Sequence, residues 1–167
     1  MNDRLVSRML TEECEDVRDY AEVFGDCRTA WDNCDRADWM LMVAFRLGVD
    51  RRKLAGALAE CVSTVGHLIR DARCINTFNA LRRYAVGEIE DGALKRYVKA
   101  SPRPGSKTWA DAAAVHGGNF APRPAITCVV EAAHKAGEAS TIGEHDEICA
   151  DIVRKWIKFE FLKQRPG

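Results

Sequence analysis

The residues best suited to chemistry are four histidines and seven cysteines, and two pairs that include them, one with a glutamate, have the spacing of metal ligands. His145 and Cys149 stand four residues apart, and Glu131 and His134 stand three apart, so each pair would share one helix face. A structural zinc site needs four ligands, and a di-iron bundle needs two Glu-x-x-His pairs with two further carboxylates. The chain has one such pair and no CxxC motif. We therefore predict no metal site and no cofactor.

Cysteine catalysis is the second chemical option. A nucleophilic thiol needs a histidine beside it and a third group that orients the histidine. Cys128 and His134 are six residues apart, more than one helical turn, and share a helix face poorly. Motifs of hydrolase, phosphate and dinucleotide sites are absent from the sequence. We predict no catalytic residue, and an enzyme built on His134, His145, Cys128 and Cys149 stays as an alternative.

Helices would have to position these side chains. Apolar residues recur at three- and four-residue intervals, and no segment shows the alternation of a half-buried strand. The run 39–45 is apolar on nearly all sides and is predicted to be the central buried helix. The longest amphipathic pattern covers 51–70. We expect an all-α fold class, a single compact bundle of about seven to nine helices within one domain, residues 1–167.

Helix ends are predicted from capping chemistry. Polar side chains expected to open helices are Thr11, Thr29, Asp50, Asn76 and, in a Thr-x-x-Glu capping box, Thr141. Glycines expected to end helices are Gly25, Gly48, Gly87 and the pair Gly117-Gly118. The segment 101–107 contains two prolines and is predicted to be a mobile loop.

Composition restricts the class of protein. Of the 167 residues, 47% are hydrophobic and 30% are charged, which excludes a disordered chain. The N-terminal residues lack the apolar run of a signal peptide, and no stretch approaches the ~20 apolar residues of a membrane span. An odd number of cysteines indicates free thiols in a reducing compartment. We expect a cytoplasmic protein.

Charge is unevenly distributed although the formal net charge is zero. Residues 11–38 contain ten acidic and three basic side chains, whereas 39–107 contain six acidic and thirteen basic ones. Such segments are typical of solvated helix faces, but they also suit charged partners. The basic segment leaves nucleic-acid binding open as an alternative.

Tryptophans add to the candidate contact residues. Trp39 and Trp156 lie on apolar stripes and are predicted to be core, whereas Trp31 and Trp109 have more polar surroundings. The candidate partner-binding residues are Glu12, Glu13, Asp16, Asp19, Asp26, Trp31, Asp35, Arg82, Arg83 and Trp109.

Four stretches of the chain carry a resemblance: TAWDNCDRADWMLMVAFRLGVDRRKLAGALAECV, ALRRYAVGEIEDGALKRY, the Ala-rich WADAAAV with VVEAAHKAGEAS, and ICADIVRKWI. From about Ala30 onward the chain resembles a helical family of bacteria and phages, which comprises immunity proteins of polymorphic-toxin systems and hypothetical phage proteins. The chain departs from the family's long Ala repeats at Gly117-Gly118 and at Pro122-x-Pro124.

The resemblance implies an all-helical binding protein without a cofactor or a catalytic motif. We expect a non-catalytic inhibitor whose partner is a protein. That partner would be either a cognate toxin or a bacterial defence complex blocked by a phage, in the manner of an anti-CRISPR protein.

Overall fold

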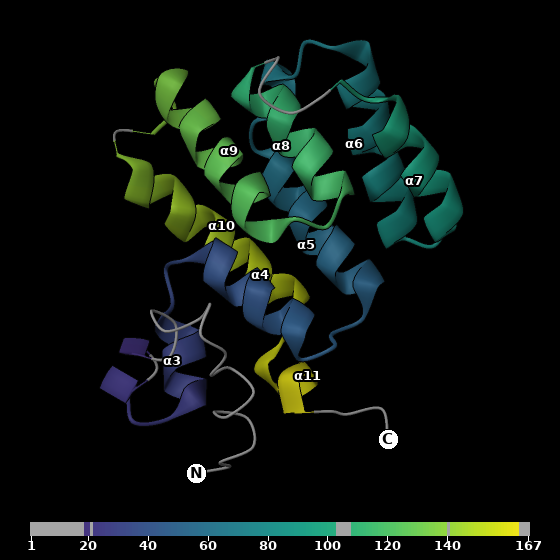
Figure 1. The fold of residues 1–167 in the computed structure, drawn as a ribbon. Helices are drawn as coiled ribbons and strands as arrows, with labels where there is room; N and C mark the ends of the chain where they lie inside the picture. Colours follow the sequence, from purple (N-terminus) through teal and green to yellow (C-terminus); the bar gives the residue numbers. More distant parts are fainter. Residues whose placement is uncertain (1–18, 21, 103–107, 140, 164–167) are drawn as a thin grey trace.

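The computed structural model describes residues 19–163 except 21, 103–107 and 140, and within these residues the chain is helical without a strand (Figure 1). In chain order the helices are α3 (Cys27–Asn33), α4 (Ala37–Arg46), α5 (Arg51–Ser63), the 3-10 helix η2 (Gly66–Leu68), α6 (Ala72–Ala85), α7 (Asp91–Ala100), α8 (Trp109–Gly118), α9 (Pro122–Lys135), α10 (Ile142–Trp156) and α11 (Phe159–Lys163). The all-α prediction, with about seven to nine helices, is confirmed. No helix in the described part is long and apolar enough to cross a membrane.

Helix α5, rather than α4, is the central element of the bundle. Its residues from Leu54 to Ala59 are all buried, because it packs against α4, α6, α8, α9 and α10. On α4, by contrast, Phe45 is 49% exposed and Trp39 and Met42 are half-buried. The prediction that 39–45 forms the central helix is therefore wrong. An apolar sequence does not by itself decide how many neighbours surround a helix.

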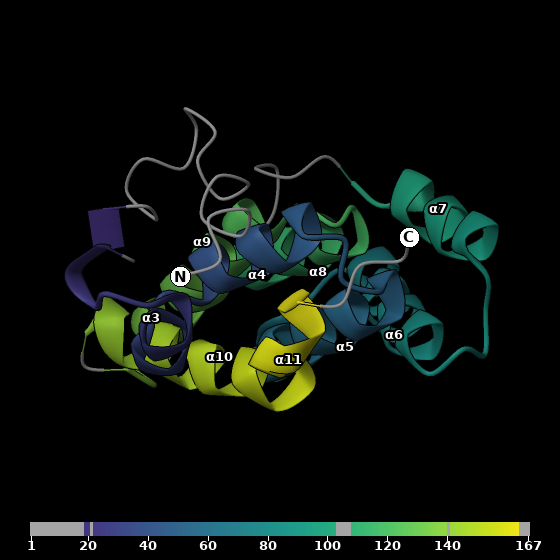
Figure 2. The same cartoon turned by 90° about the horizontal axis from the view of Figure 1, so that it is seen from below.

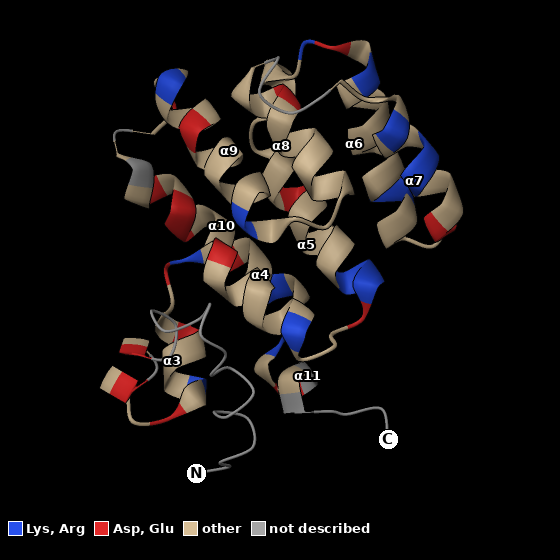
Figure 3. Cartoon of the chain, in the orientation of Figure 1, with Lys and Arg blue, Asp and Glu red and all other residues tan. Residues whose placement is uncertain are grey.

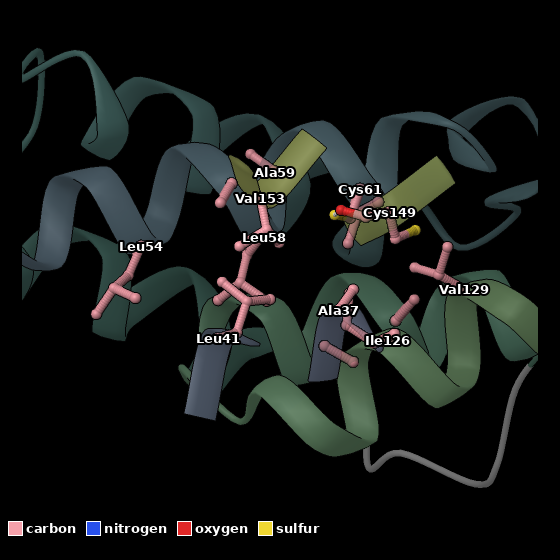
Figure 4. Close-up of a cluster of buried hydrophobic side chains, with 14 of the residues drawn as sticks. Ala37, Leu41, Leu54, Leu58, Ala59, Cys61, Ile126, Val129, Cys149 and Val153 are labelled. Carbon is pink, nitrogen blue, oxygen red and sulfur yellow. Dashed lines mark hydrogen bonds between the residues drawn. The ribbon is translucent and has the colours of Figure 1, made fainter. Parts of the chain in front are cut away.

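The core lies where α5 meets the helices around it. Figure 4 shows Leu58 from α5, Leu41 from α4 and Val153 from α10 within one cluster, and all three are at most 1% exposed. Seen from below, α5 lies between α10 and α6, whereas α7 lies at the edge of the molecule (Figure 2). Helix α7 accordingly buries one residue, Leu94.

Two predicted helix starts are wrong because an aspartate upstream caps the helix instead. The Asp26 carboxylate accepts hydrogen bonds from the backbone N–H groups of Arg28 and Thr29, so α3 begins before Thr29. Asp71 likewise accepts from the N–H of Arg73, and α6 begins at Ala72 rather than at Asn76. The caps predicted for Asp50 and Thr141 are confirmed. Thr11 lies outside the described residues, as do residues 103–107 of the predicted loop.

Helix α5 ends at Ser63, although the apolar pattern continues to residue 70. The hydroxyl of Ser63 donates to the Glu60 carbonyl and that of Thr64 donates to the Cys61 carbonyl, both at 2.7 Å. These side chains satisfy carbonyls that a longer helix would bond with its backbone, and the chain turns into η2.

Gly117 and Gly118 do not stop a helix, contrary to the prediction. Both are buried inside the last turn of α8. A Cβ on Gly118 would lie 2.7 Å from a Val98 methyl of α7 and 2.8 Å from a Thr77 methyl of α6, so the absence of a side chain lets α8 pack this closely against both helices. Gly48 and Gly87 do end helices with positive φ, at 75° and 81°, as predicted.

A buried carboxylate joins the starts of α6 and α8. Asp111 is 1% exposed and accepts from the N–H groups of Arg70 (2.9 Å) and Asp71 (3.0 Å). It also accepts from the Thr108 hydroxyl at 2.8 Å. The Thr108 hydroxyl in turn accepts from the backbone N–H of Asp111 and so caps the start of α8. Burial alone would raise the pKa of Asp111, but these hydrogen bonds together lower it.

Candidate protein-binding groove

Of the four side chains considered for catalysis, His145, Cys128 and Cys149 are buried in the packing of the fold. His145 is 5% exposed, and its Nε2 lies 2.9 Å from the Thr64 hydroxyl. Burial lowers the pKa of His145. Cys128 is buried whereas His134 is exposed, and within the described ranges no three His, Cys, Asp or Glu residues gather as metal ligands.

The described cysteines are unbonded thiols, and most of them are buried. Burial raises the pKa of Cys128, and raises that of Cys34 to about 11. The Cys61 thiol donates to the backbone carbonyl of Cys149 at 3.7 Å. The neighbouring Cys149 side chain and burial raise the pKa of Cys61 well above its usual value. Thiols with raised pKa are protonated near neutral pH and are weak nucleophiles.

A closed polar junction holds the start of α4 against α9 and α10. Arg36 donates two hydrogen bonds, of 3.0 and 2.9 Å, to Asp38, which is only 4% exposed. The same guanidinium lies 3.3 Å from Asp146, which also accepts from the Ala37 N–H. Arg123 of α9 approaches Asp38 at 3.5 Å. These charges pair with one another, so the junction serves to hold the helices together.

The predicted partner-binding residues do not form one surface. Glu12, Glu13 and Asp16 lie outside the described residues, and Asp19 and Asp35 are exposed. The carboxylate of Asp26 caps α3, and its hydrogen bond from the Thr29 hydroxyl is the main cause of its lowered pKa.

The two tryptophans singled out as more open differ in exposure. Trp31 is 7% exposed and belongs to the core. The prediction that Trp31 is open to a partner is therefore wrong, because α3 packs the side that carries Trp31 against the rest of the protein. Trp109 is 40% exposed, as predicted, with the Lys135 ammonium 4.8 Å from its ring centre. Trp39 and Trp156 pack against the core but are only half-buried.

A groove of about 560 Å³ lies between α5, α6, η2 and the end of α10. Its lining is mostly apolar or small, with four polar side chains: Gly56, Ala59, Glu60, Ser63, Gly66, His67, Phe78, Arg82, Ala85, Val86 and Trp156. This volume falls within the range of ordinary ligand and side-chain pockets. Of the predicted contact residues, Arg82 lines the groove and Arg83 follows it on α6.

One wall of the groove is built around Trp156. Its ring lies directly on the backbone of Gly56, where a Cβ would overlap the ring. The indole Nε1–H donates to Glu60 at 2.5 Å, and the Lys155 ammonium donates to the other oxygen of that carboxylate at 2.6 Å. The Lys155 hydrogen bond is the main cause of the lowered pKa of Glu60, which is therefore ionised at neutral pH. The ring is held in place without being fully covered.

The opposite wall carries an unpaired charge beside apolar surface. The Arg82 guanidinium lies 5.8 Å from the centre of the Phe78 ring. Among the described residues no carboxylate pairs with Arg82, whereas its neighbour Arg83 lies 3.2 Å from Glu88. Val86, one turn further along, is 67% exposed. Sequence analysis missed Phe78, Val86, Gly56 and Trp156 as groove residues, because no local pattern distinguishes them.

Comparison with known proteins adds no assignment. No known protein family, curated protein or solved structure matches this chain.

Proposed function

We propose that this chain is a non-catalytic binding protein of the cytoplasm that inhibits a protein partner by covering part of the partner's surface. The observation that carries the proposal is the groove beside α5, where Trp156, Arg82 and Val86 surround an apolar floor. Tryptophan and arginine next to apolar surface are typical of the residues that dominate protein interfaces.

The engagement of the chemically able side chains supports a binding role over an enzymatic one. His145 contacts Thr64, and Cys61 contacts the carbonyl of Cys149. Asp38 and Asp146 are paired with Arg36. Each of these groups contributes to holding two segments together, and none of them lines the groove.

The inhibitor has two versions that differ in the partner. One is immunity against a cognate toxin of the cell's own polymorphic-toxin system. The other is a phage-encoded inhibitor of a bacterial defence complex, in the manner of an anti-CRISPR protein. Both require a stable protein complex that blocks an activity of the partner.

The test is affinity capture of the tagged full chain from its native host, followed by mass spectrometry. The wild-type chain is compared with Arg82→Glu and with the matched control Arg96→Glu, an exposed arginine on α7 outside the groove. We expect one stoichiometric protein to be captured by the wild type and the control and lost with Arg82→Glu. Equimolar chain should abolish the captured protein's activity; a captured protein whose activity is unchanged contradicts inhibition.

A specific observation favours nucleic-acid binding as the second candidate. Lysines and arginines of α6 and α7 follow one edge of the molecule (Figure 3). Of these, Arg82, Arg96 and Lys99 have no acidic partner in the described part of the chain, and Arg70, just before α6, has none there either. This candidate predicts binding to duplex DNA that weakens steeply as salt rises. Absence of binding at low salt removes it.

A further inference from the structure

We propose, resting on the function above, that the groove receives a segment of the partner protein that presents an aromatic or large aliphatic side chain beside a carboxylate. The apolar side chain enters between Trp156 and Phe78, and the carboxylate pairs with Arg82. The contacts of the two walls lead to this chemistry.

The floor of the groove admits a large side chain because the residues along it are small. Gly56, Ala59, Ser63 and Gly66 follow one another on α5 and the turn after it. The chain's own Trp156 ring covers Gly56 and stops there. The Phe78 ring packs on Gly66 at the other end of the row. The space that remains lies over Ala59 and Ser63, between Trp156 on one side and Phe78 on the other. A planar or branched apolar side chain would bury both rings.

Of the charged side chains that line the groove, one is left for a ligand to pair with. Glu60 is already engaged by Lys155 and by the Trp156 indole. His67, at the η2 end, lies 2.6 Å from Glu138. Arg82 is the lining charge with no acidic partner among the described residues. A carboxylate complements it, since a guanidinium binds carboxylates through two parallel hydrogen bonds.

Val86 indicates that the occupant is part of a macromolecule. It is 67% exposed at the edge of the groove next to Ala85, so apolar surface continues beyond the pocket itself. A free amino acid would leave this edge uncovered, whereas a polypeptide segment anchored in the groove would cover it.

The first experiment measures recognition with a minimal probe, N-acetylphenylalanine, which has the ring and the carboxylate but no chain. A ligand of this size binds in roughly the millimolar range. We follow the indole N–H signal of Trp156 by NMR, assigned with Trp156→Phe, and compare the probe with its uncharged C-terminal amide. We expect saturable shifts of this signal and about three- to tenfold weaker binding of the amide.

Arg82→Gln should make the acid and the amide bind equally, whereas the matched control Arg96→Gln should preserve the difference. Shifts confined to the Trp109 indole, equal binding of acid and amide to the wild type, or no saturable shift overturn the proposal.

The second experiment separates failure of the groove from failure of the proposed function. Photo-reactive benzoylphenylalanine is placed at position 86 or at position 109 of the full chain in its native host. A partner protein cross-linked at 86 and not at 109 supports the groove. A partner cross-linked only at 109 overturns the groove and leaves the binding function standing. A cross-link at 86 to a second copy of the chain or to nucleic acid overturns the proposed occupant.

Discussion

The two ends of α10 meet the rest of the bundle in different ways. Near its start, Asp146 lies against the first turn of α4, where Arg36 and the Ala37 N–H satisfy its oxygens. At its end, Trp156 rests on Gly56 of α5, and Lys155 and Glu60 pair beside it. The first junction is closed, since the charged groups face one another. The second leaves a groove and an arginine, Arg82, without an acidic partner in the described residues.

The Asp146 end of α10 therefore stabilises the fold, whereas the Trp156 end offers a surface that another molecule can contact. A buried charge needs an oppositely charged partner within the fold, because removing that partner leaves a buried charge that nothing compensates. An exposed charge beside apolar surface contributes little to folding, but it can orient a partner. Removing the charge of Arg36 at the closed end should therefore affect folding far more than removing the charge of Arg82 at the open end.

The closed junction should be the most sensitive. Arg36→Ala leaves Asp38, 4% exposed, and Asp146 without their shared guanidinium. We expect the free energy of unfolding to fall by about 3–4 kcal/mol, measured by urea denaturation. Arg28→Ala, which removes exposed contacts with Glu160 and Asp32, serves as the control and should cost much less, because exposed ion pairs contribute little to stability. Equal losses in both variants would show that the junction is not special.

The same junction should make stability depend on pH. Burial raises the pKa of Asp146 from 3.8 to about 6, with the N–H of Ala37 acting in the opposite direction. The folded state therefore holds this proton more tightly than the unfolded state. Stability from Asp146 is fully present below pH 4 and is lost as pH rises through 6, by roughly 2–3 kcal/mol. Asp146→Asn should flatten that part of the profile of unfolding free energy against pH; an unchanged slope contradicts the assignment.

The contact of Trp156 with α5 should give the next effect. Gly56→Ala places a Cβ within the Trp156 ring, so the ring must move away from α5. We expect a loss of about 1–3 kcal/mol and a shift in tryptophan fluorescence. The control is Gly92→Ala in α7, where a Cβ meets no atom within 4 Å, and it should leave stability unchanged or slightly increased. Wild-type fluorescence in Gly56→Ala would place Trp156 elsewhere.

The open side of the groove should be the least sensitive for folding. Arg82→Gln removes an exposed guanidinium whose described contact is the Phe78 ring. We expect the free energy of unfolding to stay within about 0.5 kcal/mol of the wild type, while binding of the N-acetylphenylalanine carboxylate weakens. A large loss of stability would make Arg82 a structural residue and would remove the contrast between the two ends of α10.

Some elements were predictable because the signal is local. Asp50 and Thr141 cap their helices, and Gly48 and Gly87 end theirs, since capping depends on a few neighbouring residues. Where two capping side chains competed, as with Asp26 and Thr29, the sequence did not rank them. The Thr108-x-x-Asp111 spacing is a capping signal that sequence analysis overlooked.

The candidate groove was predictable only in part. Arg82 and Arg83 stand out in the sequence as a charged pair, and Arg82 does line the groove. Trp156 was expected to be core, because its apolar stripe gives no sign that one edge of the ring stays uncovered. Gly56 looks like any small residue of an amphipathic helix. Its importance appears only when residue 156 is brought onto it from one hundred positions away.

By itself, the sequence of this protein determined its helical class, several helix ends and the uneven distribution of charge, because these follow from side-chain periodicity and nearest-neighbour chemistry. Only the tertiary structure decided which helix is central, that Gly117-Gly118 is a close crossing, and where charges are left unmatched. The physical reason is that burial and ion pairing depend on which surfaces meet, and that is a property of distant segments packed together.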